Sequence, residues 1–177
     1  MTTLIRRYLA ALTLDPRVFE EVEADRGATG QALIVVLLAA VGAGLGNAGV
    51  GADARPALVA IVAGSVVAWV AWALLIYLLG TQVMPERGTS SDFGEVLRTL
   101  GFAAAPGALR AFEVFGDTRW LVMPITALWM IAAMVVAIRQ ALDYTSTARA
   151  VALSLLGWAV SFGVAVIVGL LLARPVS

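Results

Sequence analysis

The sequence predicts an all-α protein: a polytopic transmembrane bundle of five helices with a short amphipathic segment at its N-terminus. The first observation is composition, because 61% of the 177 residues are hydrophobic and 14% are charged, whereas soluble domains are about 45–50% apolar and about 25% charged. The second is a series of five apolar stretches, four of which reach the roughly 20 residues that a membrane-spanning helix needs. A soluble core could not absorb this much apolar surface, so we expect the bilayer to be the solvent.

Residues 1–30 are expected to lie in the cytosol or at the membrane interface. Apolar side chains recur there at helical spacing beside two arginines, which suits a helix in the headgroup region: Leu4, Ile5, Tyr8, Leu9 and Leu12. Asp15 followed by Pro16 is a helix-start signal, a carboxylate N-cap before a proline in the first turn. The apolar run is short and no small-residue cleavage motif follows it, so we expect no cleaved signal peptide.

The membrane domain is expected over residues 31–174. Its five spans are predicted at about 31–50, 57–80, 93–115, 119–139 and 147–173. Three of the five tryptophans inside these spans either line a ligand cavity or, more simply, face lipid or pack as bulk: Trp69, Trp72 and Trp129.

The span predicted at 93–115 differs from the others because its charge-free centre is short. That centre, Thr99–Leu109, covers only about 16 Å of helix, while the hydrocarbon layer is about 30 Å thick. The segment can cross as a kinked helix if Arg98 and Arg110 extend to the interfaces or if other helices bury it. The alternative is a break near Pro106 into two half-helices that enter the membrane and return.

Proline explains why a kink is expected. Pro106 removes the helical hydrogen bond to the carbonyl of Phe102, and in lipid such a carbonyl needs another partner. Pro124 is a second proline within a predicted span, nearer the start of its helix.

Two charged pairs flank the short centre, and they are the candidate binding residues. Glu95 and Arg98 are three residues apart, as are Arg110 and Glu113, so each pair can share a helix face. One interpretation is a polar seam that binds a partner, a proton or a small solute. The other is a pair of interfacial ion pairs that make a short span tolerable in lipid.

Glycines mark the candidate packing positions. Gly42 and Gly46 form a small-xxx-small pair, which allows close helix approach either within the chain or in a homodimer. Gly101, in the third stretch, is the other glycine that we expect to serve packing.

Composition also excludes several classes of chemistry. The chain has no cysteine and no histidine, which removes disulfides, Cys/His zinc sites and Ser-His-Asp or Cys-His catalysis. The net charge of zero gives no argument for nucleic acid binding. No cofactor, metal site or catalytic residue is predicted.

The arginines predict an orientation. With a cytoplasmic N-terminus, eight of the twelve basic residues fall on the cytosolic side and four outside, in the direction of the positive-inside rule. We therefore expect a multi-pass protein of the cell membrane with its N-terminus in the cytoplasm and its C-terminus outside.

Two groups of residues carry a resemblance to a known family. The first lies in the third stretch: Phe93, Leu97, Arg98, Gly101, Phe102, Ala103 and Pro106. The second precedes the last span: Ala141, Thr145, Arg149 and Ala150. Together with the order of the spans, they resemble the Yip family of Ypt/Rab-interacting five-span membrane proteins, in particular its bacterial branch, over roughly residues 10–173.

This resemblance implies five membrane helices, a cytosolic N-terminus and no known catalytic residues. Eukaryotic relatives act in vesicle trafficking and contact prenylated Rab GTPases. The N-terminal segment of this chain, residues 1–30, is much shorter than the cytosolic region of those relatives, so the resemblance does not extend to a Rab-like role.

Two functions follow as hypotheses. The first is a non-enzymatic Yip-type membrane protein that organises membrane or protein partners through its cytosolic face and third span. The alternative is a small transporter or channel, or a membrane subunit of one, that uses the charged, kinked third span. The expected partners are the lipid bilayer and another membrane or cytosolic protein, with a homo-oligomer as a further alternative and no nucleic acid.

Overall fold

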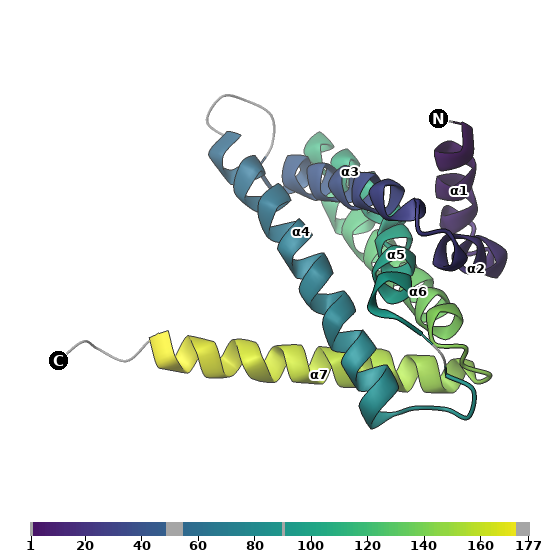
Figure 1. Cartoon of the computed structure of the whole chain (residues 1–177). Helices are drawn as coiled ribbons and strands as arrows, with labels where there is room; N and C mark the ends of the chain where they lie inside the picture. Colours follow the sequence, from purple (N-terminus) through teal and green to yellow (C-terminus); the bar gives the residue numbers. More distant parts are fainter. Residues whose placement is uncertain (1, 49–54, 90, 173–177) are drawn as a thin grey trace.

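The computed structural model describes residues 2–48, 55–89 and 91–172, and the regular secondary structure within them is all helical (Figure 1). The all-α prediction is therefore confirmed. The elements in chain order are α1 (Thr2–Leu12), α2 (Pro16–Ala24), α3 (Ala28–Ala48), α4 (Arg55–Leu78), the π-helix η1 (Leu79–Val83), α5 (Phe93–Ala103), the 3-10 helix η2 (Ala105–Phe115), α6 (Arg119–Ala141) and α7 (Thr147–Leu172). Residues 49–54, 90, 173 and 174 of the predicted membrane domain lie outside the described residues.

Helices α1 and α2 form a unit, here called the collar, that covers one end of the bundle. Asp15 caps α2 as predicted, since its side chain accepts a hydrogen bond of 3.0 Å from the Arg17 N–H and Pro16 opens the helix. One face of α2 is buried in the bundle core through the side chains of Val18, Phe19 and Val22. The N-terminal segment thus packs on the membrane domain through an apolar face.

Four helical stretches among the described residues are long and apolar enough to cross a membrane: Ala28–Asn47, Arg55–Val83, Arg119–Ala141 and Thr147–Ile167. Contacts near the ends of these helices distinguish two ends of the bundle. At the collar end, the Tyr144 hydroxyl donates a 2.8 Å hydrogen bond to the carbonyl of Met84. At the other end, here called the far end, Arg119 donates a 2.9 Å bond to Asn47.

The predicted third span is not one helix. The chain forms α5, breaks at Ala104, and continues as η2 with Pro106 in its first turn. A kink at Pro106 was expected and a break there was the alternative; the break has its physical cause in the missing N–H of proline together with its ring. The turns after the break tighten to 3-10 geometry, which α-helical spacing could not foretell.

Both halves of this third segment follow α3 in the same direction. Gly101 lies against Ala32, Gly107 against Ala39, and Ala108 against Gly42. Beyond them Arg110 lies against Gly46. The contacts on α3 from Ala32 to Gly46 cover about 21 Å at 1.5 Å per residue, so the segment begins at the collar end and finishes near the far end.

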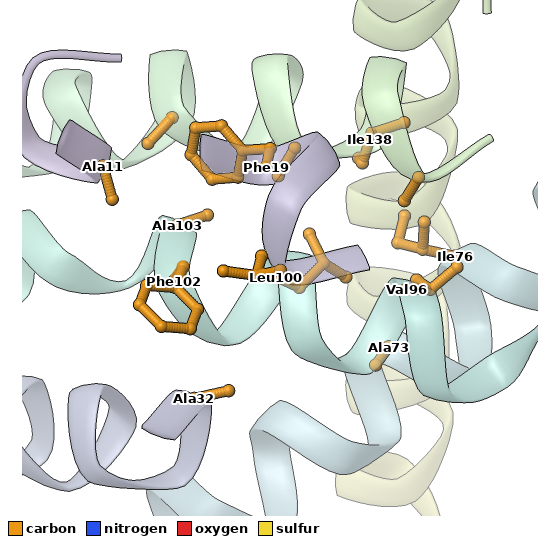
Figure 2. Close-up of a cluster of buried hydrophobic side chains, with 14 of the residues drawn as sticks. Ala11, Phe19, Ala32, Ala73, Ile76, Val96, Leu100, Phe102, Ala103 and Ile138 are labelled. Carbon is orange, nitrogen blue, oxygen red and sulfur yellow. The ribbon is translucent and has the colours of Figure 1, made fainter. Parts of the chain in front are cut away.

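The core is centred on α5, which is enclosed by other helices (Figure 2). Seven of its eleven residues are buried: Val96, Arg98, Thr99, Leu100, Gly101, Phe102 and Ala103. Figure 2 shows Phe19 and Ala11 of the collar on one side of α5, with Ala32 of α3 on the other. Because protein surrounds α5, its charged ends do not have to be solvated by lipid.

Candidate functional site

Arg98 joins the third segment to the collar. Its side chain is only 4% exposed, and its Nε donates a 3.0 Å hydrogen bond to the carbonyl of Val22. A second guanidinium nitrogen donates to the carbonyl of Glu23. These are carbonyls of the last turn of α2, which a helix leaves unpaired and where its dipole favours a positive charge. The arginine is therefore a buried C-terminal cap for α2, rather than a side chain that extends to the interface.

The predicted Glu95–Arg98 pair does not form an ion pair. Glu95 instead completes a capping box at the start of α5, accepting the Asp92 N–H at 2.7 Å while the Asp92 side chain accepts the Glu95 N–H at 2.9 Å. A residue spacing of three allowed the pair, but the strong N-cap signal of Asp92 three residues before Glu95 decided the outcome.

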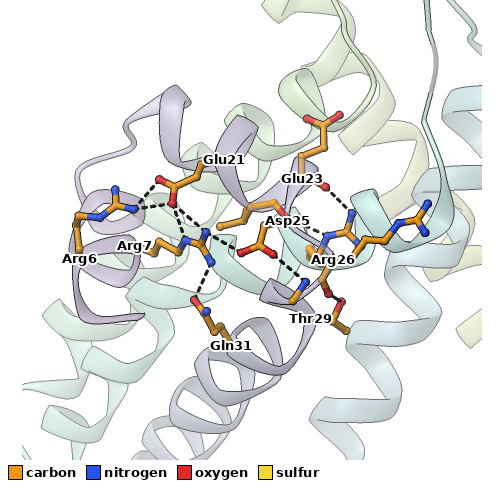
Figure 3. Close-up of polar contacts among 11 residues, drawn as sticks. Arg6, Arg7, Glu21, Glu23, Asp25, Arg26, Thr29 and Gln31 are labelled. Carbon is orange, nitrogen blue, oxygen red and sulfur yellow. Dashed lines mark hydrogen bonds and ion pairs between the residues drawn. The ribbon is translucent and has the colours of Figure 1, made fainter. Parts of the chain in front are cut away.

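A second arginine, Arg7, organises the collar itself (Figure 3). Its nearly buried guanidinium donates to Glu21 at 2.9 Å, to Asp25 at 2.8 Å and to Gln31 of α3 at 3.0 Å. Hydrogen bonds from Arg6 and Arg7 hold the pKa of Glu21 below its ordinary value, and Arg7 does the same for the pKa of Asp25. Arg7 thus ties both collar helices to the first turns of α3.

The pKa of Glu23 is shifted in the opposite direction to those of Glu21 and Asp25. Partial burial raises its pKa from an ordinary value of 4.5 to about 7, and the nearby carboxylates of Asp143, Glu95 and Glu20 add to the rise, while Arg98 opposes it. Four carboxylates from α2, α5 and the α6–α7 turn therefore gather at the junction between collar and bundle. Among the described residues none of the four makes an ion pair.

We expect the collar to bind less tightly as the pH rises from about 4.5 to about 7. An acid with a raised pKa holds its proton more tightly in the docked state, so its contribution is complete below the lower value and is lost at the higher one. The shift corresponds to at most about 3 kcal/mol, which solvent screening of a half-buried group reduces to about 1–2 kcal/mol.

This dependence is measured with spin labels on Arg17→Cys and Arg87→Cys, in a chain that has no other cysteine. The docked distance should lose population as the pH rises, and Glu23→Gln should keep it docked across the range. Asp117→Asn, at an exposed carboxylate of the far end, is the control and should titrate like the parent. An unchanged pH profile in Glu23→Gln would contradict the assignment.

Aromatic side chains supply hydrogen bonds to backbone carbonyls around the break. The Tyr8 hydroxyl donates to Ala105 at 3.0 Å, and the indole N–H of Trp69 donates to Leu97 at 3.0 Å. Trp129 donates to Leu12, the last residue of α1, at 2.8 Å. Nothing in the spacing of these residues favoured such hydrogen bonds over bulk packing, except that a proline-broken segment in lipid needs donors from other segments.

Tyr8→Phe is expected to weaken collar docking by about 1 kcal/mol, the net contribution of a typical hydrogen bond, because the bond from Tyr8 to Ala105 joins the collar to η2. Backbone hydrogen exchange around Ala104–Gly107 should rise in this variant. Tyr77→Phe is a matched control, because no hydrogen bond of the Tyr77 hydroxyl is present among the described residues. Equal exchange in both variants would show that the Tyr8 bond does not support the break.

The second predicted pair, Arg110 and Glu113, does form an ion pair. Arg110 Nε lies 2.9 Å from Glu113 Oε1, and the Glu113 side chain is fully buried. Arg119 of α6 approaches the other carboxylate oxygen at 4.0 Å. The spacing of three residues predicted the pairing of Arg110 with Glu113. Arg119 could not be predicted from spacing, because it approaches Glu113 only where η2 and α6 meet at the far end.

Glycines of α3 make room for η2, as the small-xxx-small pattern suggested. A Cβ on Gly42 would lie 2.6 Å from the carbonyl oxygen of Ala108, and one on Gly46 would lie 2.6 Å from that of Arg110. Both glycines therefore face η2 of the same chain. Pro106 is buried beside this contact, while Pro124 lies within α6 without ending it.

A pocket of about 330 Å³ opens at the collar end, between α2 and the α6–α7 turn. Its lining is polar and comes from Glu20, Arg139, Gln140, Asp143, Tyr144 and Thr145. Gln140 bridges its two sides by donating a 2.6 Å hydrogen bond to Glu20. None of these residues was a candidate site residue from the sequence, because only docking of the collar brings Glu20 against residues 139–145.

Long apolar helices with a docked polar collar define a multi-pass helical membrane protein. Within this class, the Yip1 domain family matches residues 10–169, nearly the whole chain. The protein belongs to this family, as the resemblance indicated. No match was found among curated proteins or among solved structures.

Proposed function

We propose that this protein is a non-enzymatic member of the Yip family that binds a protein partner at its collar end. The observation that carries the proposal is the capping of α2 by the buried Arg98. Burying a guanidinium costs free energy that apolar packing would not cost. An arginine at this position instead fixes where the collar sits, and with it the polar surface beside it.

The surface expected to meet the partner is the rim of the collar-end pocket. Glu20 and Asp143 are exposed there, and neither makes an ion pair among the described residues. Such a rim favours a partner with basic side chains, by charge complementarity. Arg98 and Glu95 support this surface indirectly, because they hold α2 and the start of α5 in position.

The test is photo-crosslinking in native membranes, followed by mass spectrometry of what co-purifies. A photoreactive residue at Asp143 should capture one abundant protein, and the same residue at the exposed far-end position Asp117 should not. Pro106→Ala should lower the yield by disturbing the break while leaving insertion intact. Capture of the same proteins from both ends, or of none from Asp143, would refute a collar-end partner.

We also infer that the chain crosses the membrane five times, with the collar in the cytoplasm and the C-terminus outside the cell membrane. The course of α5 and η2 alongside α3 supports a third crossing between the four long helices. The excess of arginines toward the collar end supports the orientation.

A transporter, a channel or a subunit of one is the second candidate function. It is favoured by Glu113, a fully buried carboxylate whose Oε2 has no hydrogen-bond partner within the described part of the chain. It predicts proton or solute flux in reconstituted vesicles that falls in Glu113→Gln or Glu95→Gln. Equal flux in protein-free vesicles would remove this candidate.

A further inference from the structure

We propose that Arg110 and Arg119 bind the phosphate group of an anionic phospholipid in the leaflet opposite the collar. The site lies at the far end of the bundle, away from the surface assigned to a protein partner. A test of this lipid site therefore neither supports nor refutes the proposed binding of a protein partner.

The charges at this place do not balance. Glu113 faces two guanidinium groups, from Arg110 and Arg119, so the three residues carry a net charge of +1. Asp117, the nearest acidic residue along the chain, makes no ion pair with either arginine within residues 91–172. A single negative charge, such as that of a phosphodiester, would neutralise the cluster.

Glu113 holds the arginines in a fixed arrangement. Its carboxylate is 0% exposed and sits where only a glycine fits, because a Cβ on Gly46 would lie 2.9 Å from its Oε2. It faces both arginines through their Nε atoms, at 2.9 and 4.0 Å. A guanidinium has five N–H donors, so this contact leaves the terminal nitrogens available for another acceptor.

Arg119 is the more accessible of the two. Its side chain is 51% exposed, and its bond to Asn47 Oδ1 at 2.9 Å uses one terminal nitrogen. Arginine binds phosphate through paired N–H groups, and a guanidinium already oriented by two protein groups loses little entropy on binding. Arg110, 25% exposed, can donate to the same phosphate from the side of η2.

The surroundings indicate a lipid rather than a soluble anion. Exposed aromatic rings flank the arginines: Phe112, Phe115 and Trp120. The rings of Phe112 and Phe115 lie 6.4 Å apart, and Trp120 is 76% exposed. Tryptophan at the end of a membrane helix lies at headgroup level and phenylalanine in the acyl chains, so this arrangement matches the headgroup and upper tail of one lipid.

The experiment uses the full chain in nanodiscs of phosphatidylcholine, with and without phosphatidylglycerol. Native mass spectrometry counts phosphatidylglycerol retained on the protein. Arg119→Gln should lower retention roughly tenfold, as expected for the loss of one charge-assisted hydrogen bond, and Arg110→Gln should lower it less. Arg55→Gln removes an exposed arginine at the same end of the bundle and should retain the lipid like the parent.

Each arm can overturn the proposal. Equal losses in Arg119→Gln and Arg55→Gln would mean general surface attraction, and no loss in Arg119→Gln would mean that lipid binds elsewhere. Inorganic phosphate added to phosphatidylcholine discs should not stabilise the protein as phosphatidylglycerol does. If it does, the site binds a free anion. Should Arg119→Gln fail to insert, Arg119→Lys keeps the charge without the paired donors and should still retain less lipid than the parent.

Discussion

Replacing Arg98 with methionine is expected to release the collar from the membrane domain. Methionine matches the length of the arginine stem but cannot donate to the carbonyls of Val22 and Glu23, which the structure buries at the end of α2. Leaving buried carbonyls without donors costs about 1–3 kcal/mol for each group. We therefore expect collar docking to weaken by about 2–5 kcal/mol.

Hydrogen exchange of the α2 amides in nanodiscs measures this effect. Protection in Pro16–Ala24 should fall by more than tenfold, while that of α3 should change little. Arg87→Met is the matched control, because Arg87 is an exposed arginine of the loop before α5. If the α2 amides of Arg98→Met exchange like those of Arg87→Met, the arginine does not hold the collar.

The second large effect is expected at Gly42. An alanine Cβ would lie 2.6 Å from the carbonyl oxygen and 2.9 Å from the Cα of Ala108, both backbone atoms. A backbone contact cannot be relieved by a side-chain rotation, so α3 and η2 must separate along their length. Overpacking of this kind costs about 1–3 kcal/mol, and the shared contact at Gly46 would be strained as well.

Gly64→Ala gives the same substitution where nothing lies within 4 Å of the added methyl group. In the middle of α4 it should stabilise the helix by about 0.5–1 kcal/mol. Thermal unfolding in one detergent compares the two variants. A Gly42→Ala protein at least as stable as Gly64→Ala would show that the α3–η2 contact is looser than described.

The parts of the fold that were predictable depend on local signals. Apolar runs predicted the four long helices, and Asp15 with Pro16 predicted the start of α2. Pro106 predicted a distortion of the third segment at this point, a kink or a break, since proline acts on its own turn.

The parts that were not predictable depend on contacts between distant residues. Arg98 caps a helix that ends more than 70 residues earlier, and Trp129 bonds to Leu12 across 117 residues. No spacing rule relates such positions, so Arg98 looked like the partner of Glu95. Arg119 was likewise missed, because only the meeting of η2 and α6 brings it to Glu113.

We infer that the broken third segment crosses the membrane with the collar docked at one end. Single cysteines at Thr3, Arg87 and Asp117, all exposed positions of a cysteine-free chain, test it with a membrane-impermeant maleimide on oriented vesicles. We expect positions 3 and 87 to label from one side and position 117 from the other. Labelling of positions 87 and 117 from the same side would mean that the segment enters and returns, which would contradict the account.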